Sequence, residues 1–394
     1  MDFFEQRDRA KEKTRPLVVA FFLAVLAYIV AANVVIASLY VLFNTWNPFH
    51  ILTNVLYLFG EALVYPRHFF ALIWNPHVAI FCTLGVLLSI ALGCFYKFRC
   101  LARGGAAVAE MLGGRKIAAE TTIPEERTLR LVVEEMAVAA LLPVPEIYLL
   151  DYERGINAFA AGHTHDDIAI GVTFGAVKLL TRDELQGMIA HEFSHVLNGD
   201  TRLNLKLMVV VHGIFWPTLA GRILVHNTTE QLSMLEDTID LDQLRVLLLP
   251  LAFLLLAVGW IGSPLVRLIK RALCREREWL ADAEAVQFTR YPTGIEGALK
   301  KIGGLLKAGR LDTPGAEVAS HLYFVNCRHE PWFDFLSTHP PLAKRILAID
   351  PAFNGEFQHI PSLPRPEVAE AAKYDRVYRD SLDRARKARK SDEA

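Results

Sequence analysis

An HExxH pattern occupies residues 191–195, where two histidines and a glutamate stand at spacings that suit metal chemistry. Four helical residues turn the chain through about 400°, so His191 and His195 project from one helix face about one turn apart. That separation suits two imidazoles binding one Zn²⁺ ion. Glu192 is next to the first histidine and can act as general base and acid on a metal-bound water. The pattern predicts a zinc site for hydrolysis.

A catalytic zinc site needs a third protein ligand and one open position. The best candidate is Glu278, which follows the last long apolar stretch of the chain. Asp282 stands one helical turn further on, where it could accept the free imidazole N–H of a ligand. Alternatively, Glu278 and Asp282 are a solvated acidic pair next to Arg275 and Arg277. Glu276 and Glu284 lie in the same segment and are rival ligands.

The HExxH pattern falls within a segment that carries its own helix-start signal. Thr181 followed by Glu184 is a capping-box signature, in which the two side chains satisfy unpaired amides at a helix start. It predicts a helix over 182–198, and this helix would hold both histidines rigidly. Apolar neighbours around the pattern indicate that the helix is partly buried.

The residues before this helix predict a small sheet next to a further helix. An amphipathic pattern predicts a helix over 125–140, which Pro143 and Pro145 would end. Three short runs rich in strand-forming residues then follow, separated by turn residues: 146–150, 157–160 and 168–173. The soluble part of the chain is therefore expected to be of the α+β class and mostly helical.

The composition excludes several classes of protein. In 394 residues, 53% are apolar and 22% are charged, and the mean hydropathy is +0.26. These values exclude a disordered chain and favour a membrane protein. Five cysteines without a CxxC pair make a disulfide framework improbable. The net charge of −1 gives no electrostatic footprint for nucleic acid, so no nucleic-acid partner is predicted.

Two apolar stretches near the N-terminus predict transmembrane helices. Residues 17–43 contain 27 uncharged positions, and residues 77–96 form a second uncharged run. About 20 apolar residues suffice to cross the hydrocarbon core. A signal peptide would have a shorter apolar region of about 7 to 15 residues, so 17–43 is interpreted as an anchor.

Two later stretches, 207–221 and 246–266, predict a membrane hairpin over 203–266. The second has 21 uncharged residues, whereas the first has only 15 and covers about 22 Å of about 30 Å of hydrocarbon. It is therefore expected to enter obliquely or to lie partly at the interface. A hairpin returns the chain to the side it left, so His195 and Glu278 can share one metal.

Lysine and arginine flank the outer ends of these stretches, which predicts their orientation. Five basic residues precede the first span, whereas the loop 44–76 carries only Arg67. Residues 1–16 are therefore expected in the cytoplasm and 44–76 outside it. The catalytic unit would comprise 97–202 and 267–370 on the cytoplasmic side, and a charged tail would follow over 371–394.

Four motifs in order resemble the HtpX-type family of membrane zinc endopeptidases, which is related to the CAAX prenyl endopeptidases. They are HEFSHVLNGD, preceded by NAFAAG and followed by REREWLADAEA and STHPPLAKRI. The resemblance covers roughly residues 125–349 and includes the paired apolar segments between HEFSHVLNGD and REREWLADAEA. It implies a gluzincin-like zinc peptidase domain on a multi-span membrane protein.

The resemblance also implies roles for particular residues. Glu278 would be the third zinc ligand and Asp282 the hydrogen-bond partner of a ligand. An extended peptide substrate would lie along the edge strand that contains Asn157, Ala158, Phe159 and Ala160, since backbone hydrogen bonds bind any sequence. His339 would support catalysis and Arg345 would lie near the substrate; a helix start capped by Thr338 is the alternative explanation of that motif.

The sequence thus predicts a zinc endopeptidase that binds one Zn²⁺ ion per chain. Its expected substrates are misfolded or membrane polypeptides, its second partner is the lipid bilayer, and a bacterial plasma or inner membrane is its expected location. A prenyl-protein endopeptidase is the alternative within the same chemistry. An inactive zinc-bearing scaffold or membrane-assembly factor is the alternative from another class, although a structural zinc would need no Glu192.

Overall fold

The computed structural model describes residues 76–226, 277–305 and 339–361, with shorter pieces at 274–275 and 322–325 and scattered single residues elsewhere. Several of the predicted segments therefore fall outside the described residues, wholly or almost so. These are the cytoplasmic N-terminus 1–16, the spans 17–43 and 246–266, the loop 44–76 and the tail 371–394. They stay predictions.

A four-stranded mixed sheet lies at the centre of the soluble part, with the strand order β1-β2-β4-β3. The strands β2 (Glu146–Leu150), β3 (Ala158–Ala161) and β4 (Ala169–Thr173) agree within one residue with the three predicted runs. The short strand β1 (Arg115–Lys116) was not predicted. β2 pairs with β4 in parallel and β3 pairs with β4 antiparallel, which places β3 at one end of the sheet.

Both faces of the sheet are buried, so its strands lack polar alternation. Side chains on one face of the sheet, such as Ile147 and Ile170, pack in a core that includes residues of several helices. Side chains on the other face, such as Tyr148 and Phe159, belong to a second core with Val108 and residues near the start of the longest helix. The sheet therefore forms the middle layer between helices on either side.

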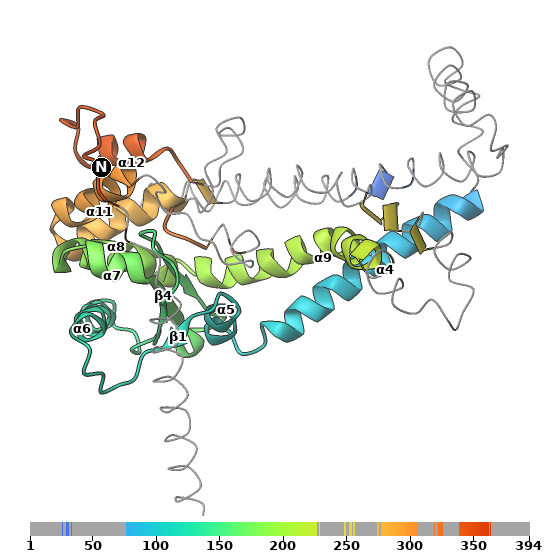
Figure 1. Cartoon of the computed structure of the whole chain (residues 1–394), viewed down its shortest axis with the longest axis horizontal. Helices are drawn as coiled ribbons and strands as arrows, with labels where there is room; N and C mark the ends of the chain where they lie inside the picture. Colours follow the sequence, from blue (N-terminus) through green and yellow to red (C-terminus); the bar gives the residue numbers. More distant parts are fainter. Residues whose placement is uncertain are drawn as a thin grey trace, which may run out of the picture.

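Helices of several lengths surround the sheet and are shown in Figure 1. α6 (Pro124–Ala139) and α8 (Arg182–Leu197) lie on one face of the sheet, and α11 (Pro292–Gly304) packs against α8 in the same core. The remaining short elements are α5 (Gly105–Met111), η2 (His165–Asp167), α7 (Phe174–Leu179) and α12 (Leu342–Ile349). Residues 277–289 are also helical. The mostly helical α+β class is thus confirmed.

Helix α8 begins as the sequence predicts. Its N-cap residue Thr181 accepts from the backbone N–H of Glu184 at 3.3 Å, and the Glu184 carboxylate accepts from the backbone N–H of Thr181 at 2.7 Å. This capping box satisfies two amides that lack intrahelical partners. Ten residues of α8 are buried, from Leu185 to Val196, and the helix is therefore fixed on both sides.

Within the part of the chain that the structure describes, two helices are long and apolar enough to cross a membrane: Thr83–Cys100 within α4 (Pro76–Cys100), and α9 (Asp200–His226). Figure 1 shows both extending from the sheet-bearing part of the molecule, and they pack against each other. Only 17% and 33% of their apolar windows are buried inside the structure. Lipid would cover such surface, whereas a soluble monomer rarely exposes it.

The first arm of the predicted hairpin differs from the expected length. The sequence predicted a short segment over 207–221, but α9 is one continuous helix of 27 residues, which spans about 40 Å. It continues through Lys206 and Arg222, the charges that bounded the apolar run. Pro217 lies inside the helix without ending it. The length of the uncharged run therefore underestimated the length of the helix. Long basic side chains within a membrane helix can extend toward water, so they do not end it.

We expect Gly187 of α8 to be required for the contact with α11. A Cβ atom at this position would lie 2.4 Å from the backbone nitrogen of Ile295. Because backbone cannot move aside cheaply, G187A should lower the free energy of unfolding by about 1 to 3 kcal/mol. Thermal unfolding of the purified protein in detergent measures this.

The matched control is G85A, because no described atom lies within 4 Å of a Cβ at Gly85 in α4. Its unfolding midpoint should stay at or above that of the wild type. Equal midpoints for G187A and the wild type would show that α8 and α11 do not pack at this distance.

Candidate active site

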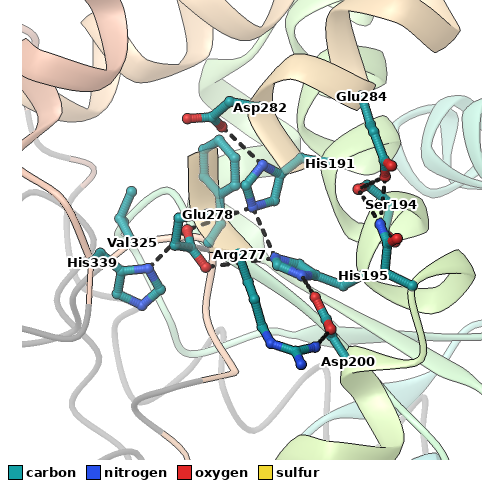
Figure 2. Close-up of polar contacts among 12 residues, drawn as sticks. His191, Ser194, His195, Asp200, Arg277, Glu278, Asp282, Glu284, Val325 and His339 are labelled. Atoms are coloured by element: carbon teal, nitrogen blue, oxygen red, sulfur yellow. Dashed lines mark hydrogen bonds and ion pairs between the residues drawn. The ribbon is translucent and has the colours of Figure 1, made fainter. Parts of the chain in front are cut away.

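Three side chains from two helices converge at the centre of the site, as Figure 2 shows. His191 and His195 come from α8, and Glu278 comes from the helical segment 277–289. The two histidine Nε2 atoms lie 3.2 Å apart. The carboxylate oxygens of Glu278 lie 3.7 Å from Nε2 of His191 and 3.5 Å from Nε2 of His195. One ligand atom of each residue thus faces a common point.

The spacing of these atoms fits a tetrahedral metal site. Donors about 2.0 to 2.1 Å from a tetrahedral Zn²⁺ ion lie about 3.3 Å apart, close to the 3.2 Å between the two Nε2 atoms. One ligand atom from each of the three residues lies within 4.8 Å of the others. Among the described residues, these three form the one group of histidine, cysteine and carboxylate side chains that could hold a metal ion. Three protein donors leave a fourth position open, which is typical of catalytic and not of structural zinc.

The His191 ring nitrogen that points away from the other ligands, Nδ1, contacts the carboxylate of Asp282, and Arg345 binds that carboxylate. Nδ1 of His191 lies 2.9 Å from Oδ1 of Asp282. Asp282 accepts two bonds from the guanidinium of Arg345, at 2.8 Å from Nε and 2.7 Å from Nη2. Arg345 also donates to the carbonyl of Phe324 at 2.7 Å. Since Arg345 is completely buried, it lies behind the ligand and not on an accessible substrate surface.

The outer nitrogen of His195 has an equivalent partner that the sequence analysis missed. Nδ1 of His195 lies 2.9 Å from Oδ2 of Asp200, and Oδ1 of Asp200 contacts Nη1 of Arg277. Gly199 has a φ of +72°, a left-handed conformation that favours glycine and lets the chain turn back after α8. The Asn198-Gly199 pair after the helix was the available signal for this return.

His339 lies on the other side of Glu278. Its Nδ1 is 2.9 Å from Oε2 of Glu278, and the imidazole is almost completely buried. The predicted proximity of His339 to the site is therefore present in the structure, and its partner is the carboxylate. The helix that follows begins at Leu342 with Pro341 as the N-cap residue. Thr338, the capping residue of the alternative explanation, lies outside the described residues.

Glu192 differs from the neighbouring acidic residues in its hydrogen bonding. It is buried, and neither carboxylate oxygen has a hydrogen-bond partner among the described residues. The backbone N–H of Ala160 approaches it and favours its charged form, but falls outside hydrogen-bond geometry. Burial dominates and raises the pKa of Glu192 to about 8. A carboxyl group with a raised pKa can both take and return a proton near neutral pH.

The electrostatics of His191 and Glu278 suit metal binding. Burial lowers the pKa of His191 to about 4, so its imidazole is neutral at physiological pH. Burial acts to raise the pKa of Glu278, but the adjacent His339 and the two other histidines hold it well below its usual value. Neutral imidazole and ionised carboxylate are the forms that bind metal.

The rival ligand Glu284 lies away from the cluster. Its carboxylate accepts from the hydroxyl of Ser194 and from Nδ2 of Asn198 at 2.6 Å. These contacts join the same two helices on a different side, since six helical residues rotate a side chain by about 240° from Glu278. The second rival, Glu276, lies outside the described residues.

The predicted substrate strand is buried in this structure. Asn157, Ala158, Phe159 and Ala160 are at most 3% exposed. Residues 322–325 lie along the outer edge of β3: the N–H of Phe324 donates to the carbonyl of Ala158 at 2.9 Å. The side-chain amide of Asn157 bonds to the backbone of Val325 in both directions. The edge near Asn157 is therefore occupied, and Ala160 is the residue of β3 nearest Glu192.

Comparison with known proteins identifies the family. The family model described as Peptidase family M48 matches residues 124–352. The chain belongs to peptidase family M48. It is 31% identical over 265 residues to the "Protease HtpX homolog" of Streptococcus uberis, covering 66% of this chain and 84% of that protein. The "Protease HtpX homolog" of Streptococcus pyogenes serotype M28 is 32% identical over 266 residues, covering 67% and 85%.

A solved structure, that of S. mikatae Ste24p, aligns with a TM-score of 0.36 at 16% identity. The alignment covers 77% of this chain and 63% of that one, so the chain spans less than two thirds of its length. Membership of family M48 and the HtpX homologues confirm the predicted family resemblance. The protein is a membrane metalloprotease. As a peptidase of this family it uses a bound metal ion, and its substrates are polypeptides.

Metal content should distinguish Glu278 from its rival Glu284. E278Q should lose bound metal because one of three donors is weakened, whereas E284Q keeps its hydrogen bonds to α8 and should retain metal. D282A should retain metal at about 10- to 100-fold lower affinity, as partners of ligating histidines do. Elemental analysis and chelator competition on purified protein measure both quantities. Metal loss in E284Q with retention in E278Q would refute this ligand set.

Proposed function

We propose that this M48 protease is a zinc-dependent endopeptidase in which His191, His195 and Glu278 bind one Zn²⁺ ion. The observation that carries the proposal is the convergence of their donor atoms, which lie within 4.8 Å of one another in the protein interior, next to the buried Glu192. Two imidazoles and one carboxylate match the donor set of catalytic zinc with one open position.

In this proposal Glu192 moves the protons of peptide-bond hydrolysis. A bound zinc ion would polarise the scissile carbonyl and lower the pKa of the attacking water. The Glu192 carboxylate accepts the proton of that water and donates it to the nitrogen of the leaving amine. Its lack of a hydrogen-bond partner leaves both oxygens available for this transfer, and its burial keeps bulk water away from them.

The residues around the ligands hold them in place. Asp282 fixes the orientation of His191 through Nδ1 and is itself fixed by Arg345. His339 restrains Glu278 at Oε2 and supports catalysis from there. Arg345 acts through Asp282 in this arrangement; its predicted direct contact with substrate would require a rearrangement of a completely buried side chain. Contacts of this kind set the geometry and basicity of metal ligands.

The substrates proposed are unfolded or membrane-embedded polypeptides. A peptide that adds to the edge of β3 gains backbone hydrogen bonds irrespective of its sequence. Because residues 322–325 occupy the edge near Asn157, such a peptide binds beside Ala160 or replaces them. Ala160 is also the strand residue whose N–H approaches Glu192, so a peptide there would lie next to the proposed base.

The domain is proposed to face the cytoplasm of a bacterial cell from a multi-span anchor. α4 and α9 supply two spans, and the apolar stretches 17–43 and 246–266 supply two more. An even number of spans between two parts of one site returns the chain to the same side. The basic residues that flank the outer ends favour the cytoplasm for both halves, 97–202 and 267–370.

Glu192 also argues against the scaffold alternative. A structural zinc site is closed by four protein ligands and needs no buried, unpaired carboxylate beside it. Such a group destabilises the fold and is retained where chemistry needs it. A preference for prenylated substrates gains no support from the described residues.

The substitution E192Q should abolish proteolysis and leave the metal bound. Proton transfer is worth about 10² to 10⁴ in rate, and the amide cannot accept the proton. A casein-type cleavage assay, run beside elemental analysis of the same preparations, measures both effects. Activity near that of the wild type, or loss of metal together with activity, would contradict the assigned role.

The topology can be tested by cysteine labelling in intact cells. L235C and K390C are introduced separately into a chain whose five native cysteines are replaced by serine. A membrane-impermeant reagent should label position 235, between the two proposed spans of the hairpin, and should leave position 390 protected. Labelling at 390 from outside would place the tail on the wrong face and contradict the orientation.

A further inference from the structure

Each of the two histidines is backed by an aspartate, and each aspartate by an arginine. His191 contacts Asp282, which Arg345 holds. His195 contacts Asp200, which Arg277 holds. The first set lies between α8, the helix 277–289 and α12, whereas the second lies where α8 turns into α9. Figure 2 shows the contacts of His191 with Asp282, of His195 with Asp200 and of Asp200 with Arg277.

We propose that Asp200 is a positioning residue for the metal site, and that Arg277 holds Asp200 in place. This rests on the proposed function, in which His195 is a ligand. The carboxylate of Asp200 accepts the Nδ1–H of His195 and thereby selects the tautomer whose Nε2 lone pair faces the other ligands. It also fixes the plane of a ring that packing encloses less completely than the ring of His191, since the His195 side chain is 11% exposed and that of His191 is 0% exposed.

The burial of Asp200 supports this role. Its side chain is 3% exposed, and both of its oxygens are directed at site residues, one at His195 and the other at Arg277. An ionised carboxylate is costly in such a place unless it is paired. A residue that served only as an acid in the first turn of α9 would remain stabilised by the helix dipole while pointing into solvent.

Arg277 gives the contact a second consequence. It directly precedes Glu278, so its pairing with Asp200 joins the segment of the third ligand to the turn after the second ligand. The pair thereby limits how far Glu278 can move from His195. Because Asp200 is also the first residue of α9, the same contact connects the metal site to a proposed membrane span.

Zinc affinity of the full-length chain in detergent tests this inference without recourse to activity. D200A should bind zinc about 10- to 100-fold more weakly than the wild type, similarly to D282A. D200N keeps an acceptor oxygen, so its zinc affinity should lie between those of D200A and the wild type. In Co²⁺-substituted protein, D200A should also alter the visible absorption that reports ligand geometry, which a purely structural role of Asp200 would leave unchanged.

Asp151 provides the matched control, because it forms an aspartate–arginine pair with Arg115 remote from the site. D151A should keep the zinc affinity and the cobalt spectrum of the wild type. R277Q should weaken zinc binding less than D200A, and the double variant D200A/R277Q should be no weaker than D200A alone, since both changes break one unit.

Wild-type affinity and an unchanged cobalt spectrum in D200A would overturn the inference and leave the proposed function intact. Absence of zinc binding by the wild type would overturn both. If D200A does not fold, D200N and R277Q decide: wild-type zinc affinity in both would refute a positioning role, and weakened affinity in both with D151A unchanged would support it.

Discussion

The contact between α8 and the helical segment 277–289 is the constraint on which the rest of the structure depends. His195 and Glu278 are 83 positions apart, yet their side chains must approach within hydrogen-bonding range in a buried interface. Burying imidazoles and carboxylates is unfavourable unless each finds a partner. The seam therefore places most of its carboxylates next to a histidine or an arginine. Ser194 and Glu284 extend it along the helices.

One carboxylate in this seam has no hydrogen-bond partner on either oxygen among the described residues. The charges of Asp282 and Asp200 are balanced by Arg345 and Arg277, whereas Glu192 is buried without a hydrogen-bond partner among the described residues. The contrast separates two tasks. Compensated carboxylates hold geometry, because their charge is fixed and their position determined. An uncompensated carboxylate has a raised pKa and can exchange protons, which is the property that hydrolysis requires.

The sheet and the long helices set where this seam lies. Strand β3 passes behind Glu192, and its other edge is bonded to β4 in the middle layer, so the strand cannot move away. α9 starts at Asp200 inside the site and continues as a helix long enough to cross a bilayer. A single glycine turn at Gly199 thus connects α8, which carries His191 and His195, to the start of α9. Substrate must approach in the space that these elements leave.

Features set by neighbouring residues could be predicted from the amino-acid sequence. The HExxH spacing, the capping box at Thr181 and the extents of β2 and β4 follow from helix and strand periods, and the structure agrees. Tertiary structure decided the partners. Nothing local shows that Arg345 faces Asp282 in the interior, or that Asp200 returns to His195. Such pairs join segments whose relative placement depends on the angles at which helices pack against one another. The local sequence pattern of a chain does not encode these packing angles.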